Sequence, residues 1–114
     1  MIAVIFEVTP FEGKMESYLA AAATLGQKLQ EMDGFISVER FQSLTQPEKL
    51  LSLSFWRDEQ AVAAWRNFEE HRQVQKAGRQ QIFEDYHLRI ASVIRDYGKN
   101  DRDEAPNDSR GVHG

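Results

Sequence analysis

The side chains best suited to chemistry in this chain include an indole and an imidazole six residues apart, Trp65 and His71. Trp65 follows two small residues, Ala61 and Ala64, on one apolar helical face. This spacing suits an aromatic anchor in a core, and it also suits the wall of an aromatic-lined pocket. The imidazole of His71 titrates near neutrality and could transfer protons, although its polar surroundings also suit a solvated surface. We predict that Trp65 contacts a substrate and that His71 handles protons.

Glu7 is a second candidate for proton handling. It interrupts the apolar run of residues 4–8. A carboxylate in such a run is costly to bury unless it is paired or hydrogen-bonded. It therefore faces a polar cavity or pairs across a sheet with Arg40 or Arg89. We predict catalytic roles for Glu7 and His71 together.

Aromatic and basic side chains recur near the end of the chain. We expect Arg89 and Arg95 on one face of the last strand, with Tyr86 and Tyr97 nearby. Such a set would bind an anionic, aromatic ligand or would form contacts between subunits. Phe68 lies on the apolar face of the preceding helix. We predict that Phe68, Tyr86 and Arg89 contact the substrate.

Several site types have no basis in this sequence. The chain has no cysteine, which excludes disulfides, thiolate metal sites and cysteine nucleophiles. It has no Gly-rich phosphate loop, nucleophile elbow or His-Glu-x-x-His spacing. A metal site from His71 and His87, with Glu70 or Asp85, is conceivable. We nevertheless predict no metal and no cofactor.

Composition limits the partners. The 114 residues fit one domain, and 41% hydrophobic with 28% charged residues is ordinary for a globular protein. A formal charge of −4 predicts neither nucleic-acid binding nor a membrane surface. The first ten residues lack a basic leader and a cleavage site, so we expect a cytoplasmic protein.

Hydrophobic periodicity predicts a strand, a helix and a hairpin in the first half. Residues 2–8 read as a strand buried on both faces. A helix beginning near Thr9-Pro10 or a few residues later carries an apolar stripe to Met32 and stops at Gly34. Residues 35–44 and 50–56 alternate as strands around a turn at residues 45–48.

The second half predicts helical segments and a last strand. Asp58 can cap a helix whose apolar face includes Trp65. Residues 69–81 read as a second, weakly amphipathic helix. Leu88, Ile90 and Ile94 belong to a final strand that ends near Tyr97. From residue 99 the chain is charged and nearly free of large apolar groups, so we expect a domain at 1–98 and a flexible tail at 99–114.

The order strand, helix, strand, strand, helix, strand predicts a ferredoxin-like α+β fold with one antiparallel sheet. Two helices can cover only one face of such a sheet. The strands, however, carry apolar residues on both faces, among them Phe41, Leu51, Leu53 and Phe55. We therefore predict a homodimer in which two sheets pack face to face.

Several short segments together resemble the antibiotic biosynthesis monooxygenase family of dimeric α/β-barrel proteins. They are Gly34-Phe35, residues 55–59 (Phe-Trp-Arg-Asp-Glu), Ala61 to Trp65, Asp85-Tyr86 and Arg95-Asp96-Tyr97. The resemblance implies a homodimer with a cavity in each subunit between sheet and helices. It also implies a monooxygenase that inserts oxygen from dioxygen into an aromatic or quinone-like small molecule without a cofactor. The substrate's own carbanion or enolate would reduce dioxygen, and Trp65 would line the cavity.

Two alternatives stay open. Haem-degrading relatives of the family combine a strand-one Asn, a helix-two Trp and a haem-ligating His. Trp65 matches the Trp, but Glu7 or a neighbour stands at the first position, and the His position falls near Gln75 or Lys76, beyond His71. The other alternative is a dimeric protein that binds a small ligand without catalysis.

Overall fold

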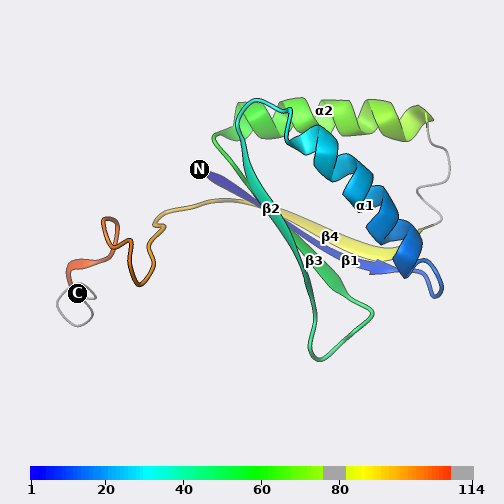
Figure 1. Cartoon of the computed structure of the whole chain (residues 1–114), viewed down its shortest axis with the longest axis horizontal. Helices are drawn as coiled ribbons and strands as arrows, with labels where there is room; N and C mark the ends of the chain where they lie inside the picture. The colour runs from blue at the N-terminus through cyan, green and yellow to red at the C-terminus, as the bar shows by residue number, and fades with distance from the viewer. Residues whose placement is uncertain (76–81, 109–114) are drawn as a thin grey trace.

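The computed structural model describes residues 1–75 and 82–108, with side chains for all of these except residues 70–75. Figure 1 shows how the strands and helices are arranged. They are β1 (Ile2–Pro10), α1 (Met15–Leu29), β2 (Phe35–Gln42), β3 (Leu50–Trp56), α2 (Glu59–Gln75) and β4 (Phe83–Ser92). The strands form one antiparallel sheet in the order β2-β3-β1-β4. The predicted ferredoxin-like α+β fold is confirmed.

Most element boundaries differ slightly from the prediction, and the last strand differs most. It ends at Ser92 rather than near Tyr97. Ser92 pairs with Ile2 at the start of β1, and the N–H of Val93 donates to the carbonyl of Met1, 3.0 Å away. Beyond that point β1 offers no further backbone to pair with. The prediction that Arg95 shares a strand face with Arg89 is therefore wrong.

The helices also differ from their predicted limits. α1 begins at Met15 and ends at Leu29, three residues before the predicted end at Met32. The two helical segments predicted around residue 69 form one continuous helix, α2, as far as Gln75. The remainder of the predicted second segment, residues 76–81, lies outside the described residues.

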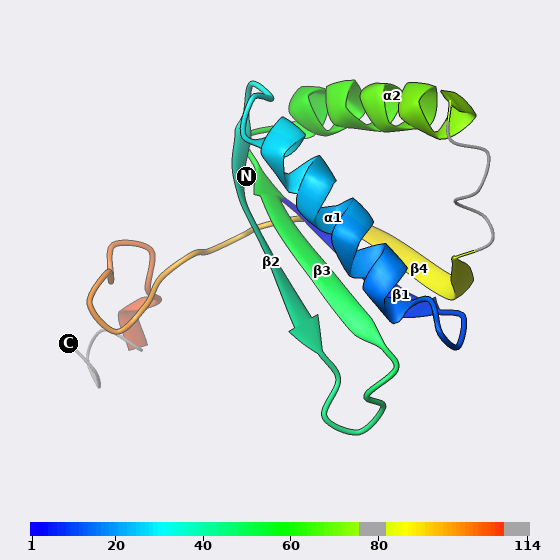
Figure 2. The same cartoon turned by 45° about the vertical axis from the view of Figure 1, so that its right-hand side comes forward.

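One face of the sheet packs against both helices, which lie on the same side of it (Figure 2). Alternation assigns the even-numbered residues of β1, β3 and β4 to this helix face. Near α1, Val8 and Leu50 pack with Tyr18. Near α2, Trp56 is 1% exposed and packs with Leu29, Ala61 and Val62. The Trp56 indole N–H donates to Ser54 Oγ, 2.9 Å away, so its one polar group is satisfied.

The opposite, helix-free face carries the odd-numbered residues of β1, β3 and β4, except that a register shift returns Phe83 to the helix face. The large apolar side chains on this face are at least partly exposed. They are Ile5, Phe41, Leu51, Leu53 and Phe55. Both faces of the sheet are therefore apolar, but helices cover only one.

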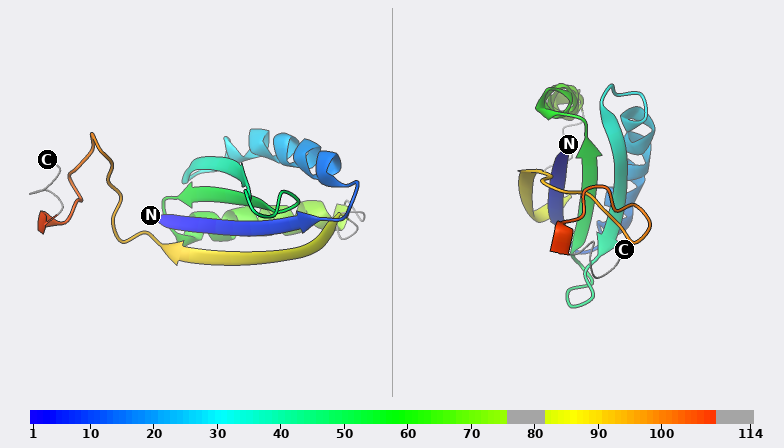
Figure 3. Two further views of the ribbon diagram at one scale, coloured as in Figure 1. Left: turned by 90° about the horizontal axis from the view of Figure 1, so that it is seen from below. Right: turned by 90° about the vertical axis from the view of Figure 1, so that its left-hand side faces the viewer.

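Residues 93–108, the C-terminal arm, leave the sheet beside the N-terminus and extend away from it (Figure 3). The arm makes the molecule long, with extents of 53 × 34 × 20 Å. Whether the predicted tail beyond residue 98 is flexible stays a prediction. None of the helices within residues 1–75 and 82–108 is long and apolar enough to cross a bilayer.

Gly34 connects α1 to β2 in a conformation that favours glycine. Its φ of +86° lies in the left-handed region that favours glycine. The prediction that Gly34 stops the first helix is wrong, because α1 has already ended at Leu29, and Gly34 turns the chain into β2. A Cβ at this position would lie 2.6 Å from the Cβ of Ala61 in α2. Glycine here therefore serves both the turn and the close approach of the second helix.

We predict that Gly34→Ala destabilises the fold more than Gly13→Ala. Gly13 has a similar φ of +82°, but a Cβ there would meet nothing within 4 Å. The backbone cost alone is about 1 kcal/mol, whereas the added clash raises the cost at Gly34 to about 3 kcal/mol. Urea unfolding of both variants measures the difference. Equal losses would contradict the role given to the contact with Ala61.

Candidate functional site

The structure separates the predicted site residues between the two faces of the sheet. Trp65 and Phe68 of α2 and Tyr86 of β4 belong to the helix side. Glu7 and Arg89 pair with each other on the helix-free face. One subunit therefore does not bring all the predicted residues into one site. A single pocket can use either the aromatic residues of the helix side or the charged pair of the helix-free face.

Trp65 and Phe68 form an aromatic wall on α2. Their rings stack with centroids 5.4 Å apart and planes inclined by 27°. Trp65 also packs on Trp56, with centroids 6.2 Å apart. It is half-buried, so the indole joins the core on one side and keeps part of its surface exposed. Both interpretations of Trp65, as core anchor and as pocket wall, fit this position.

The helix face of β4 carries an exposed apolar strip. Tyr86, Leu88 and Ile90 are 59%, 50% and 46% exposed, and they alternate along the strand. Tyr86 packs on Phe6 and Phe83, with ring centroids 5.8 and 6.2 Å away. The strip leads along β4 from this aromatic cluster toward the end of the sheet where α2 begins.

Sequence reasoning missed most of this strip. It singled out Tyr86 but not Leu88 or Ile90 as ligand contacts. The signal was present, since apolar residues at 86, 88 and 90 alternate with Asp85, His87 and Arg89. That alternation indicates an apolar face, but only the folded structure shows that α1 and α2 leave this part of it exposed.

Glu7 lies between two cations. Lys49 Nζ is 2.9 Å from Glu7 Oε1, and Arg89 Nη1 donates to Glu7 Oε2. The hydrogen bonds from Lys49 and then Arg89 hold the pKa of Glu7 below its usual range. The pairing with Arg89 is confirmed, whereas the alternative partner Arg40 stands on the helix side of β2. A carboxylate with a lowered pKa is a weak base, which argues against Glu7 as a proton acceptor.

A groove of about 240 Å³ surrounds this ion pair. It is lined by Glu7 together with residues 41–43 and 49–51, at the hairpin end of the sheet. Sequence reasoning missed both Lys49 and the groove. Lys49 lies in the hairpin loop, and its position beside Glu7 depends on the register between β1 and β3, which the sequence does not give.

The histidines give little direct evidence for a metal centre. His71 lies within α2, but its side chain is outside the described residues. His87 is exposed and opposite Glu7 on the helix-free face. Within residues 1–69 and 82–108, no three His, Asp or Glu side chains gather as metal ligands would.

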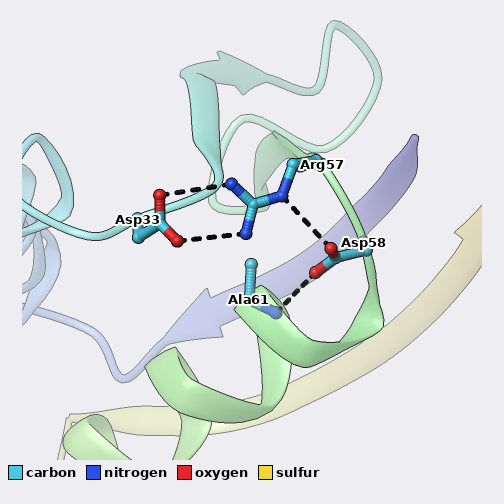
Figure 4. Close-up of polar contacts among 4 residues, drawn as sticks. All are labelled: Asp33, Arg57, Asp58 and Ala61. Atoms are coloured by element: carbon cyan, nitrogen blue, oxygen red, sulfur yellow. Dashed lines mark hydrogen bonds and ion pairs between the residues drawn. The ribbon is translucent and has the colours of Figure 1, made fainter.

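Arg57 joins the start of α2 to the turn after α1 (Figure 4). Its two terminal nitrogens donate to the carboxylate of Asp33 at 3.2 and 3.1 Å, and its Nε donates to Asp58 at 3.2 Å. Asp58 also caps α2, because it accepts the N–H of Ala61 at 2.9 Å. The predicted cap is confirmed. The conspicuous Trp56-Arg57-Asp58 segment therefore serves the fold.

These contacts shift the pKa values of Asp33, Asp58 and Arg57. Hydrogen bonds from Arg57 lower the pKa of Asp33. The N–H of Ala61, and then Arg57, lower the pKa of Asp58. The same two carboxylates, Asp33 first, raise the pKa of Arg57. All three groups are thereby held in their charged forms.

Comparison with known proteins identifies the family. The model of the family described as antibiotic biosynthesis monooxygenase matches residues 1–77. A Pyricularia oryzae protein named jasmonate monooxygenase ABM is 43% identical over 101 residues, which are 89% of this chain and 47% of that protein. This chain thus spans about half the length of that relative.

Solved structures agree on the fold. A Deinococcus radiodurans protein superposes with a TM-score of 0.73 at 13% identity, covering 86% of this chain and 97% of that one. A Mycobacterium tuberculosis protein superposes with a TM-score of 0.72 at 15% identity, covering 85% of this chain and 98% of that one. The fold is that of ferredoxin-like α+β proteins, and this chain belongs to the antibiotic biosynthesis monooxygenase family.

We predict that removing the Arg57 guanidinium makes stability less sensitive to acid. Asp33 and Asp58 have lowered folded-state pKa values, so their contribution is present above their unfolded pKa near 4 and is lost as pH falls through the folded values. Arg57→Gln should have a lower unfolding free energy at pH 7 and a shallower decline between about pH 5 and 2. Urea unfolding across this range measures both. Arg66→Gln, at an exposed site in α2, is the control and should match the parent.

Proposed function

We propose that this chain is a monooxygenase that binds its substrate against the helix face of β4, between the strip Tyr86-Leu88-Ile90 and the aromatic wall of α2. The observation that carries the proposal is the exposure of these three side chains on the same side of the sheet as Trp65 and Phe68. Large apolar groups that stay exposed beside an aromatic wall favour an apolar, planar ligand. An aromatic or quinone-like small molecule meets that description.

The proposed reaction needs dioxygen and no cofactor. A substrate whose CH2 group is acidified by adjoining aromatic and carbonyl groups loses a proton to give a carbanion or enolate. This anion donates electrons to dioxygen, a C–O bond forms, and loss of water leaves a carbonyl. The balance is CH2 plus O2 giving C=O plus H2O, so no external reductant is consumed.

The chain would contribute binding, exclusion of water and proton transfer. Trp65 and Phe68 would stack against the substrate, and the Tyr86 hydroxyl would donate a hydrogen bond to its anionic oxygen. His71 is our candidate proton acceptor, because it lies on α2 three residues, or about one helical turn, beyond Phe68. Glu7 and Arg89 stand on the other face, and we assign them to subunit contacts.

The relative's name supports a second substrate class. Jasmonate combines an apolar ring with a carboxylate, and an apolar strip on β4 also suits such a ring. Insertion of oxygen into an unactivated C–H bond consumes two electrons from outside. An assay for this substrate therefore needs an added reductant, which the first reaction does not.

The haem alternative fits the described residues poorly. The β1 side chains that face α2 and α1 near position 7 are Phe6 and Val8, which offer no side-chain hydrogen-bond donor. Glu7, at the expected Asn position, faces away from Trp65. A haemin titration tests this alternative directly: a Soret shift abolished by His71→Ala would favour it over our proposal.

We also propose that two copies pair through their helix-free faces. The partly exposed apolar side chains there are the kind of surface that a subunit contact covers. The Pyricularia oryzae relative is about twice the length matched by this chain, which leaves room for a second unit of this size. The Glu7–Lys49–Arg89 cluster would then be enclosed at the contact.

We predict oxygen uptake in metal-free buffer with an aromatic ketone that carries such an acidic CH2 group, and we assay phenols and hydroquinones beside it. Trp65→Ala should lower kcat/KM by about tenfold or more, and Tyr86→Phe by about tenfold, the worth of one hydrogen bond in the transition state. Phe11→Ala, which removes a 43%-exposed aromatic ring from the loop between β1 and α1, is the control and should leave kcat/KM unchanged. Jasmonate with a reductant is assayed in parallel. No uptake with any substrate would leave the non-enzymatic, ligand-binding alternative.

We predict that Leu53→Glu converts the dimer to monomers. Leu53 lies partly buried at the centre of the helix-free face, where a carboxylate would be desolvated without a partner. Leu44→Glu adds the same charge at the hairpin tip, where Leu44 is 99% exposed, and should leave the dimer intact. Light scattering at micromolar concentration measures both. A monomeric parent chain would contradict the pairing.

A further inference from the structure

Glu69 places a carboxylate on the covered side of α2. Buried and half-buried side chains recur at helical spacing along this helix, whereas Arg66 and Asn67 are exposed. The recurring set includes Ala61, Val62, Trp65, Phe68 and Glu69. The Oε2 atom of Glu69 is shielded from solvent. The carboxylate is therefore directed toward the interior of the molecule rather than away from it.

Glu69 also stands beside the aromatic wall. It follows Phe68 directly and lies four residues, about one helical turn, after Trp65. Side chains four residues apart on a helix are neighbours, with Cβ atoms roughly 5–6 Å apart. Trp65 packs on Trp56 of the sheet, so the side of α2 that carries Trp65 and Glu69 faces the sheet. A ligand stacked on the wall would therefore lie within reach of this carboxylate.

The path of α2 brings Glu69 level with the middle of the apolar strip. α2 begins at the end of the sheet where β4 finishes, because the last residues of β3 and β4 both pair with Ile2. It then runs back toward the end where β4 begins (Figures 1 and 2). From Glu59 to Glu69 the helix rises about 15 Å, the length of about four or five strand residues. Counted back from Ser92, that distance reaches Leu88.

The proposed reaction takes two protons from one carbon. Loss of the first proton gives the enolate, and addition of dioxygen and one proton gives a hydroperoxide whose carbon still carries hydrogen. When the second proton leaves, its electron pair forms the C=O bond, the O–O bond breaks, and the departing hydroxide takes up a proton as water. The reaction therefore needs a base twice, and His71 serves only one of these steps.

We propose that Glu69 accepts the second proton and thereby converts the bound hydroperoxide to the carbonyl product. This inference rests on the proposed function. A carboxylate is a weaker base than an imidazole. It suits the second step because the C–H bond beside the peroxide is the more acidic of the two, and because cleavage of the O–O bond makes that step favourable. The proton passes from the carboxylate to the hydroxide, so Glu69 is ready for the next turnover.

The products formed from 2-tetralone test this role, since its most acidic CH2 group lies between the ring and the carbonyl. Oxygen uptake follows the first step, whereas the ratio of hydroperoxide to diketone, measured by chromatography after quenching, follows the second. Glu69→Gln should raise this ratio at least about tenfold and change oxygen uptake less than twofold, because proton transfer by a side chain typically contributes about a hundredfold or more. Glu59→Gln, at an exposed site in the first turn of α2, is the control and should keep the parent ratio.

The outcomes separate this inference from the proposed function. No oxygen uptake by the parent chain overturns both. Uptake by the parent chain, with an unchanged ratio in Glu69→Gln, overturns the role of Glu69 alone, and so does a loss of uptake without hydroperoxide. The ratio does not depend on the amount of folded protein, so partial unfolding does not imitate the expected result. Glu69→Ala removes the carboxylate by a second substitution and should raise the ratio by the same factor.

Discussion

The sheet of this protein has two apolar faces and only two helices, and this imbalance governs the rest of the structure. α1 and the first turns of α2 cover one face of the central strands β3 and β1, where Trp56 is buried at one end and Val8 and Leu50 at the other. β4, at the edge of the sheet, keeps its helix-side residues exposed. Apolar area exposed in the isolated chain favours occupation by other molecules, since burial stabilises by about 25 cal/mol per Å². The candidate site and the proposed subunit contact both follow from this.

The position of α2 relative to the sheet depends on a compact polar junction. Gly34 allows the backbone of the preceding turn to approach Ala61, while Arg57 ties Asp33 to the capping residue Asp58. Both features fix where α2 begins. They thereby set the direction in which Trp65 and Phe68 lie relative to β4. Gly34, Arg57 and Asp58 can in this way position the proposed site without touching its ligand.

Much of the fold was predictable because its signals are local. The apolar stripe of α1, the left-handed turn at Gly34 and the alternating hairpin strands each depend on neighbours in sequence. The end of β4 was not predictable in this way, because it is set by the residue at which its partner strand β1 begins. The site was predicted only in part. Trp65, Phe68 and Tyr86 share one side of the sheet, but Glu7 and Arg89 do not, although the alternation of Phe6, Glu7 and Val8 already carried that information.

The central claim is that an aromatic ligand binds against the helix face of β4. Methyl-resolved NMR during titration with a hydroquinone tests it most directly, because both faces of the sheet carry isoleucine and leucine methyl groups. The account predicts that the signals of Leu88 and Ile90 shift in a saturable way while those of Ile5 and Leu53 stay in place. Shifts confined to Ile5 and Leu53 would place the ligand on the helix-free face and contradict the account.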